Sequence, residues 1–154
     1  MGEPELLDVL LVEDNPADTD LTIHALQKSG AISNICHVWD GEEALDFLFC
    51  RGTFASRDFS RPPRVILLDL KLPKRDGCDV LRELKSDPRT RSIPVIILTS
   101  SKEERDLLQT YRLGVNSYIQ KPVSFVEFQE VVRQLGLYWF GVNSAPPPSC
   151  FTSE

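Results

Sequence analysis

The stretch Val65-Ile66-Leu67-Leu68-Asp69 is followed by Leu70-Lys71-Leu72-Pro73-Lys74-Arg75-Asp76-Gly77. Four apolar residues lead directly into one carboxylate, and proline and glycine then mark a loop. A short apolar run bounded by turn signals is typical of a strand that is buried on both faces, as in parallel sheets. Asp69 then lies at the carboxyl end of this strand, where open α/β sheets form their ligand crevice. Taken alone, Asp69 is equally well interpreted as the acid that caps the following turn.

Strand-like and helix-like segments alternate along the rest of the chain. Further buried strands are predicted at residues 6–12, 35–39, 93–98 and 117–120. Helix starts are indicated by Asn15 before Pro16, Asp40 with Glu43, Ser101 with Glu104, and Ser124 with Glu127. In the last helix, Phe125, Phe128, Val132 and Leu135 share one face. Strands that alternate with helices pair in parallel, so we predict one α/β domain with a doubly wound, five-stranded parallel sheet and five helices.

Two segments do not follow this alternation. Residues 51–64 form a long connection in which arginines alternate with phenylalanines, and it reads either as a solvated surface loop or as a partner-binding loop. Residues 141–154 include Ala145-Pro146-Pro147-Pro148 and are predicted to be a flexible Pro-rich tail. The predicted domain therefore covers residues 6–140.

The composition excludes several classes of protein. A chain of 154 residues with a net charge of −6 is the size of one domain and lacks the basic surface of a nucleic-acid binder. No apolar run is long enough to span a membrane, and the acidic N-terminus does not resemble a signal peptide. The four cysteines have no CxxC spacing, which favours free thiols over a zinc site or disulfides. A cytoplasmic location is expected.

Five polar side chains follow the ends of the predicted strands. They are Glu13 and Asp14 after the first strand, Asp69 after the third, Thr99 after the fourth and Lys121 after the fifth. Because the carboxyl ends of parallel strands meet at one edge of a sheet, we expect these side chains to lie together. Carboxylates about 4 Å apart repel by roughly 1–4 kcal/mol per pair, so such a cluster needs a neutralising partner.

Mg²⁺ suits this cluster because it takes oxygen ligands, retains several waters and leaves room for a phosphate. Lys121 offers a compact positive charge to a phosphoryl oxygen, and Thr99 offers a hydroxyl. These groups are suited to phosphoryl transfer onto a carboxylate, with Asp69 as the nucleophile. Each residue alone can also be explained as a helix-terminal charge, a cap or a surface side chain. Because all five follow the ends of predicted strands, one shared functional site is the better explanation. The prediction requires Asp69 to be neither buried nor turned away from the other groups.

Four sequence motifs resemble the receiver domain of bacterial two-component response regulators, a family with the flavodoxin-like (CheY-like) fold. They are Val12-Glu13-Asp14-Asn15, the stretch Leu67–Pro73 with Asp76-Gly77, Leu98-Thr99-Ser100, and Lys121-Pro122. The resemblance covers roughly residues 7–135. It implies a sensor histidine kinase as partner and a signalling role, not an enzyme with a substrate of its own.

The resemblance also implies a role for each matching residue. Asp69 is the phosphoacceptor, Thr99 and Lys121 bind the phosphoryl group, and Thr99 acts with Tyr118 as the switch. The metal ligands are Glu13, Asp14, Asp69 and the backbone carbonyl of Lys71, with Asp14 the more direct ligand of the acidic pair. The Lys121–Pro122 peptide bond is expected to be cis. Lys71 departs from the common pattern, in which a small or neutral side chain is frequent, so it is expected to affect the lifetime of the phosphoryl group.

A closer resemblance is to the small stand-alone regulators of phytochrome-type histidine kinases. It depends on Asn15-Pro16-Ala17-Asp18, on the long loop before the third strand, and on Leu137-Tyr138-Trp139-Phe140. The last segment is expected either to form a homodimer or partner surface or to pack on its own domain. The output then passes through a protein contact at the face of the fourth helix, fifth strand and fifth helix.

Two other functions share parts of this pattern. A Mg²⁺-dependent aspartyl-phosphate phosphohydrolase also uses an aspartate nucleophile at a strand end. Such enzymes carry a second aspartate two residues later, where this chain has Lys71, and no segment is large enough for a substrate cap. A flavodoxin-like cofactor module needs a Ser/Thr/Gly-rich phosphate loop after the first strand, where this chain has Glu13-Asp14-Asn15-Pro16.

Overall fold

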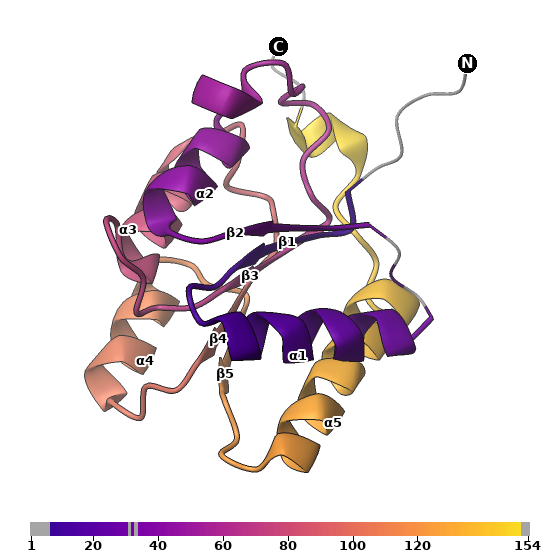
Figure 1. Ribbon diagram of the computed structural model, residues 1–154. Helices are drawn as coiled ribbons and strands as arrows, with labels where there is room; N and C mark the ends of the chain where they lie inside the picture. Colours follow the sequence, from indigo (N-terminus) through magenta and orange to yellow (C-terminus); the bar gives the residue numbers. More distant parts are fainter. Residues whose placement is uncertain (1–6, 31, 33, 152–154) are drawn as a thin grey trace.

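A single five-stranded parallel sheet forms the centre of the molecule (Figure 1). The computed structural model describes residues 7–30, 32 and 34–151. The strands are β1 (Val9–Val12), β2 (Ile35–Val38), β3 (Val65–Leu68), β4 (Val95–Thr99) and β5 (Ser117–Gln120), in the order β2-β1-β3-β4-β5. The order reverses direction between β1 and β3, which is where sheets of this type place their ligand crevice.

Five α-helices cover the two faces of the sheet. They are α1 (Pro16–Lys28), α2 (Gly41–Leu48), α3 (Gly77–Ser86), α4 (Glu104–Arg112) and α5 (Phe125–Leu137). Helices α1 and α5 pack together on one face, and α2, α3 and α4 lie on the other (Figure 1). The predicted doubly wound fold is confirmed.

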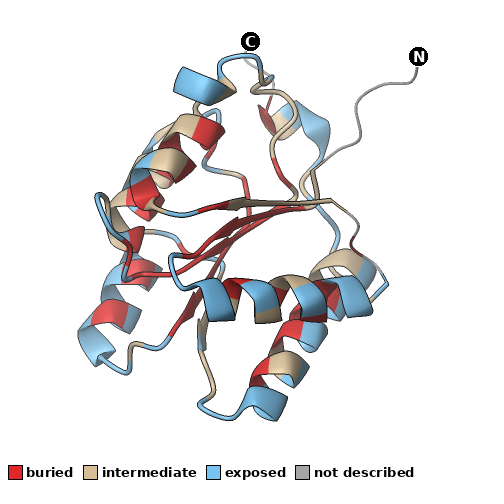
Figure 2. Cartoon of the chain, in the orientation of Figure 1, coloured by how far each residue is buried: buried red, intermediate tan, exposed pale blue. Residues whose placement is uncertain are grey.

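The strand side chains form two apolar cores, one on each face of the sheet. All residues of β1, β3 and β4 are buried, whereas the outer helix faces are exposed (Figure 2). Leu10, Ile66 and Ile97 pack toward α2 and α3, while Val9, Leu67 and Ile96 pack toward α1 and α5. The central strands read as continuous apolar runs because both of their faces are covered.

Three of the four predicted helix caps are confirmed. The side chains of Asn15, Asp40 and Ser124 accept hydrogen bonds from the backbone N–H three residues on, at 3.1, 2.7 and 3.4 Å. The capping box at Ser101 is wrong, because α4 begins at Glu104 with Glu103 as its N-cap. Ser101 accepts a hydrogen bond from the Glu103 backbone N–H and donates to Asp106, so its hydroxyl stabilises a turn ahead of the helix.

Three other expectations are not confirmed. Phe125 is 56% exposed and is not part of the buried face of α5, which consists of Phe128, Val132, Leu135 and Gly136. The Lys121–Pro122 bond is trans, so the expected cis bond is wrong; trans is favoured by about 0.5–1 kcal/mol even before proline. Leu6, at the start of the first predicted strand, lies outside the described residues, and β1 begins at Val9.

The segment after α5 continues as a π-helical turn at Tyr138–Val142. Leu137 and Tyr138 are 42% and 50% exposed, whereas Trp139 and Phe140 pack against the core on the α1–α5 face. Farther on, Pro148–Phe151 forms a short 3-10 helix, and Phe151 is buried against the core on the opposite face. The domain boundary at 140 and the flexibility of the tail stay predictions, but the described part of the tail packs on the fold through Phe151.

The long connection before β3 also packs on the domain. The Arg57 guanidinium lies 3.8 Å from the centre of the Phe47 ring and donates to the carbonyl oxygens of Phe47 and Arg61.

Among the described residues, no helix has both the length and the apolar content needed to cross a bilayer.

Candidate functional site

The register of the sheet brings the predicted residues to one edge. Val12 pairs with Leu68 in the neighbouring strand, so Glu13 and Asp69 leave the sheet side by side. The Asp69 backbone N–H donates to the Val12 carbonyl at 3.1 Å, and the Lys121 N–H donates to the Thr99 carbonyl at 2.7 Å. These bonds hold the loops from four strands at the crevice between β1 and β3.

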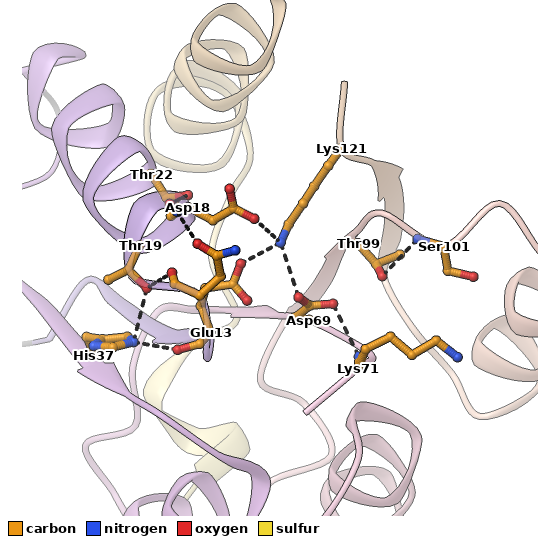
Figure 3. Close-up of polar contacts among 11 residues, drawn as sticks. Glu13, Asp18, Thr19, Thr22, His37, Asp69, Lys71, Thr99, Ser101 and Lys121 are labelled. Atoms are coloured by element: carbon orange, nitrogen blue, oxygen red, sulfur yellow. Dashed lines mark hydrogen bonds and ion pairs between the residues drawn. The ribbon is translucent and has the colours of Figure 1, made fainter. Parts of the chain in front are cut away.

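The Lys121 ammonium lies at the centre of the site (Figure 3). Its Nζ is 2.5 Å from Glu13 Oε1, 2.9 Å from Asp18 Oδ2 and 3.1 Å from Asp69 Oδ2. The side chain of Lys121 is only 9% exposed. An ammonium has three N–H donors, so these carboxylates use its full donor capacity.

Asp18 belongs to this site, although it was not among the site residues predicted from the sequence. It belongs to the motif that suggested the phytochrome-type subfamily, and it lies in the first turn of α1. An acid there already has a local explanation in the helix dipole, and its contact with Lys121 joins residues 103 positions apart. Only the packing of α1 beside the carboxyl end of β5 reveals the pair.

The site contains a cluster of three carboxylates, from Glu13, Asp14 and Asp69. One oxygen atom of each lies within 4.8 Å of an oxygen atom of the other two. Asp14 is exposed, whereas Glu13 and Asp69 are buried. Glu13 Oε2 is buried and has no hydrogen-bond partner within the described structure. A buried acceptor without a partner is costly, and a divalent cation bound by oxygen ligands would satisfy it, so these residues fit Mg²⁺.

Burial and neighbouring charges shift the pKa values in the site. Burial, reinforced by the neighbouring Asp69 carboxylate, raises the pKa of Glu13 to about 8. Burial also acts to raise the pKa of Asp69, but the neighbouring Glu13 side chain and the charge of Lys121 outweigh it and lower that pKa. The pKa of Lys121 is raised, because its carboxylate partners outweigh the effect of burial. Without a metal ion, Glu13 therefore holds a proton near neutral pH, and Asp69 is ionised.

One of the two conditions set for Asp69 is met and the other is not. It faces Glu13, Asp14 and Lys121 as predicted, but the expectation that it is not buried is wrong, since only 9% of its side chain is exposed. Its Oδ2 accepts from Lys121 and its Oδ1 accepts from the Lys71 backbone N–H at 3.3 Å. Lys121 therefore covers Asp69 in this state, and any group that reaches Asp69 must displace or recruit this ammonium.

Thr99 is the last residue of β4, and Tyr118 lies on the neighbouring strand β5, where it pairs with Ile97. Thr99 is fully buried, and its hydroxyl accepts a hydrogen bond from the Ser101 backbone N–H at 3.2 Å. The Tyr118 side chain packs partly against the core, and its hydroxyl is buried without a hydrogen-bond partner in the described structure. The switch role of this pair stays a prediction.

The Lys71 side chain turns away from the carboxylate cluster (Figure 3). Its Nζ lies 3.6 Å from Asp106 Oδ2 on α4, and Ser101 donates to the same oxygen at 2.5 Å. The Lys71 backbone stays beside Asp69, so its carbonyl remains a predicted metal ligand. Asp106 was not predicted to join the site, because its contacts form only once α4 packs beside the loop after β3.

These features define a parallel α/β domain with a carboxylate cluster and a buried lysine at the carboxyl edge of its sheet. Residues 9–133 match the family described as "Response regulator receiver domain". The match extends over most of the chain, which therefore belongs to this family.

Three relatives illustrate the similarity. The chain is 41% identical to the probable methanogenesis regulatory protein FilR2 of Methanothrix harundinacea, over 92% of this chain and 88% of that protein. The crystal structure of the phosphorylated cyanobacterial phytochrome response regulator RcpA has a TM-score of 0.86 at 38% identity, covering 93% of this chain and all of that one. The Mn²⁺-bound form of response regulator Rcp1, a protein of Synechocystis, has a TM-score of 0.86 at 35% identity, covering 92% and 99%.

Proposed function

We propose that this protein is a single-domain response regulator that accepts a phosphoryl group on Asp69 from a sensor histidine kinase. The observation that carries the proposal is the position of the Lys121 ammonium between Glu13, Asp18 and Asp69, beside a carboxylate cluster that fits a divalent cation. Family membership supports the same reading.

In the proposed transfer, an Asp69 oxygen attacks the phosphorus of the kinase phosphohistidine. The new O–P bond forms as the P–N bond breaks, and the leaving imidazole takes up a proton. The lowered pKa of Asp69 keeps its carboxylate ionised and ready to attack. Lys121 follows the negative charge from the Asp69 carboxylate to the phosphoryl oxygens. We assign the Thr99 hydroxyl, at the end of β4, to bind the same oxygens.

Glu13, Asp14, Asp69 and the Lys71 carbonyl would hold Mg²⁺ in this site. When bound, Mg²⁺ supplies positive charge that offsets the developing charge of the transferred phosphoryl group. The unpartnered Glu13 Oε2 and the Mn²⁺-bound structure of the relative Rcp1 support this assignment. The proton that Glu13 holds near neutral pH must leave when the metal ion binds.

We propose that the signal leaves the domain through the face formed by α4, β5 and α5. Leu107, Leu108 and Tyr111 on α4 are 40%, 50% and 54% exposed, as expected of an apolar face that a partner covers. Engagement of Thr99 by the phosphoryl group would free its contact with Ser101, and Tyr118 would then turn. A second copy of the chain, in a homodimer, or a downstream protein would bind the changed face. Leu137 and Tyr138 are also exposed and extend this surface.

The proposed kinase partner is of the phytochrome type, which rests on the similarity to RcpA. A cytoplasmic location fits the four free cysteines of the described chain. The negative net charge speaks against nucleic acid as the partner. We do not assign an enzyme activity toward a small molecule, because the position of the second catalytic aspartate is taken by Lys71, whose ammonium pairs with Asp106.

The test is transfer of radiolabelled phosphate from autophosphorylated histidine kinases of the same cell. The wild-type protein should acquire an acid-stable, base-labile label in the presence of Mg²⁺, and fastest from a phytochrome-type kinase. The D69N variant should acquire none. Labelling that persists in D69N would refute the assignment of Asp69, and equal labelling by all kinases would refute the choice of partner.

A further inference from the structure

Asp18 has no assigned part in the transfer described above, although it contacts Lys121 directly. The side chain of Asp18 is 30% exposed, compared with 3% for Glu13 and 9% for Asp69. Asp18 is therefore the outermost of the three carboxylates around the ammonium, and it is the one contributed by a helix rather than by a strand end (Figure 3).

We propose that Asp18 is a positioning residue for phosphoryl transfer: together with Glu13 it holds the Lys121 ammonium so that the third N–H faces Asp69, where the phosphoryl group arrives. This inference rests on the proposed function of Asp69. It assigns to α1 a part in the chemistry that the strand-end residues alone do not provide.

The Lys121 ammonium uses all of its hydrogen-bond donors. Each of its three N–H groups has one carboxylate within hydrogen-bond distance, at 2.5, 2.9 and 3.1 Å. When Asp69 becomes an acyl phosphate, its carboxyl group loses its charge and the phosphoryl group carries the charge instead. Glu13 and Asp18 are not altered by the transfer, so two N–H groups keep their partners and the third follows the charge.

Asp18 is well placed to hold the ammonium because its own backbone is fixed on both sides. Its N–H donates to Asn15 Oδ1 at 3.1 Å, and its carbonyl accepts from the Thr22 hydroxyl at 2.7 Å. Glu13 reaches Lys121 from the end of β1, and Asp18 reaches it from the first turn of α1. A lysine side chain is long and flexible, so two anchors on separate elements restrict it far more than one.

The charge of Asp18 also has a purely structural explanation. An acid in the first turn of a helix stabilises it through the helix dipole. That effect would change the stability of α1, and it would be the same whether or not residue 121 is a lysine. A positioning role must instead disappear when the lysine is removed, and this difference separates the two explanations.

The experiment measures the rate at which Asp69 is phosphorylated by phosphoramidate in the presence of Mg²⁺, with Phos-tag gels as the readout. Asp18→Ala and Asp18→Asn are compared with wild type, each in the Lys121 and the Lys121→Met background. Asp20→Asn, an exposed acid on the same helix, is the matched control. Urea unfolding of every variant reports stability separately.

We expect D18A to slow phosphorylation by about tenfold, because a misplaced ammonium weakens the interaction with the transferred group. D18N keeps an oxygen acceptor and should fall between D18A and wild type, while D20N should match wild type. In the K121M background, D18A and D18N should cause no further loss. If D18A does not fold, the D18N rate ratio in the two backgrounds decides the question alone.

Two failures are distinguishable. If wild type is not phosphorylated, the proposed function fails and this inference falls with it. If wild type is phosphorylated on Asp69 but the Asp18 variants react at the wild-type rate, only the positioning role is overturned. The same holds if they lose rate equally with and without Lys121.

Discussion

The ammonium of Lys71 lies 3.6 Å from the carboxylate of Asp106, which joins the loop after β3 to helix α4. Ser101 donates to the same carboxylate, so Asp106 is bound by residues that follow Asp69 and Thr99 by two positions each. Asp106 is 8% exposed, although it belongs to a helix whose other side is open to solvent. A displacement of either loop therefore acts directly on α4, the element that begins the proposed output face.

Replacement of Lys71 by alanine should have a small effect on stability and none on Mg²⁺ affinity. The Lys71 side chain is 60% exposed, so its ion pair contributes less than about 1 kcal/mol to the free energy of unfolding. The predicted metal ligand at this position is the backbone carbonyl, which the substitution retains. Urea unfolding and calorimetric titration with Mg²⁺ measure both effects, with K102A as an exposed control. A large loss of Mg²⁺ affinity in K71A would show that the side chain takes part in the metal site.

The stability of the metal-free protein should depend on pH through Glu13. Its pKa is raised from 4.5 to about 8 in the folded protein, mainly by burial. Between these values the folded state binds the extra proton, so the free energy of unfolding falls as pH rises from about 4.5 to about 8. The pKa of Asp69 is lowered, so the effect of its protonation on the free energy of unfolding falls at pH values below this range.

Chemical unfolding in EDTA at several pH values tests this dependence. The E13Q variant should show a flatter profile than wild type over the same range, because it has no proton to lose. Saturating Mg²⁺ should stabilise wild type more at pH 8 than at pH 6, since the proton on Glu13 competes with the ion. A wild-type stability that rises from pH 5 to pH 8 without metal would contradict this account of Glu13.

Removal of the Tyr118 hydroxyl should stabilise the protein. The hydroxyl is buried and has no hydrogen-bond partner within the described structure, a situation that costs about 1–3 kcal/mol. Tyr118→Phe should therefore raise the free energy of unfolding by about 1 kcal/mol. The control is Tyr111→Phe, because Tyr111 is 54% exposed and its hydroxyl can bind water. A destabilised Y118F would mean that the hydroxyl has a partner in solution.

Glycine is required at residue 77 because α3 begins directly against the loop that carries Asp69. A Cβ on Gly77 would lie 2.3 Å from the Asp69 carbonyl oxygen and 2.7 Å from Leu70 Cα. Both are backbone atoms, so Gly77→Ala should destabilise the protein by about 1–3 kcal/mol and slow phosphorylation by displacing Asp69. Gly141→Ala is the control, since no atom lies within 4 Å of its added Cβ. Equal melting temperatures for the two variants would contradict the packing described.

The sequence predicted the sheet and its polar edge because both depend on local signals. Buried strands show as apolar runs, and each run ends in a residue with chemical function, as at Leu68-Asp69 and Leu98-Thr99. Parallel pairing then brings those ends together without any knowledge of side-chain contacts. The helix caps at Asn15, Asp40 and Ser124 are equally local, and the structure confirms them.

The remaining features depend on contacts between distant parts of the chain. Asp18 meets Lys121 only because α1 packs beside α5 and the end of β5. Ser101 looks like a helix cap in sequence, but Asp106 engages its hydroxyl and the helix starts two residues later than such a cap requires. Phe125 has the spacing of a core residue, yet the first turn of α5 extends beyond the sheet and leaves it exposed.

The most direct test of the account is the intact mass of the protein after incubation with phosphoramidate and Mg²⁺. We predict that wild type gains one phosphoryl group, that EDTA prevents the gain, and that D69N gains none. A wild-type protein that remains unmodified, or a D69N variant that gains the same phosphoryl group, would contradict the claim that Asp69 is the phosphoacceptor.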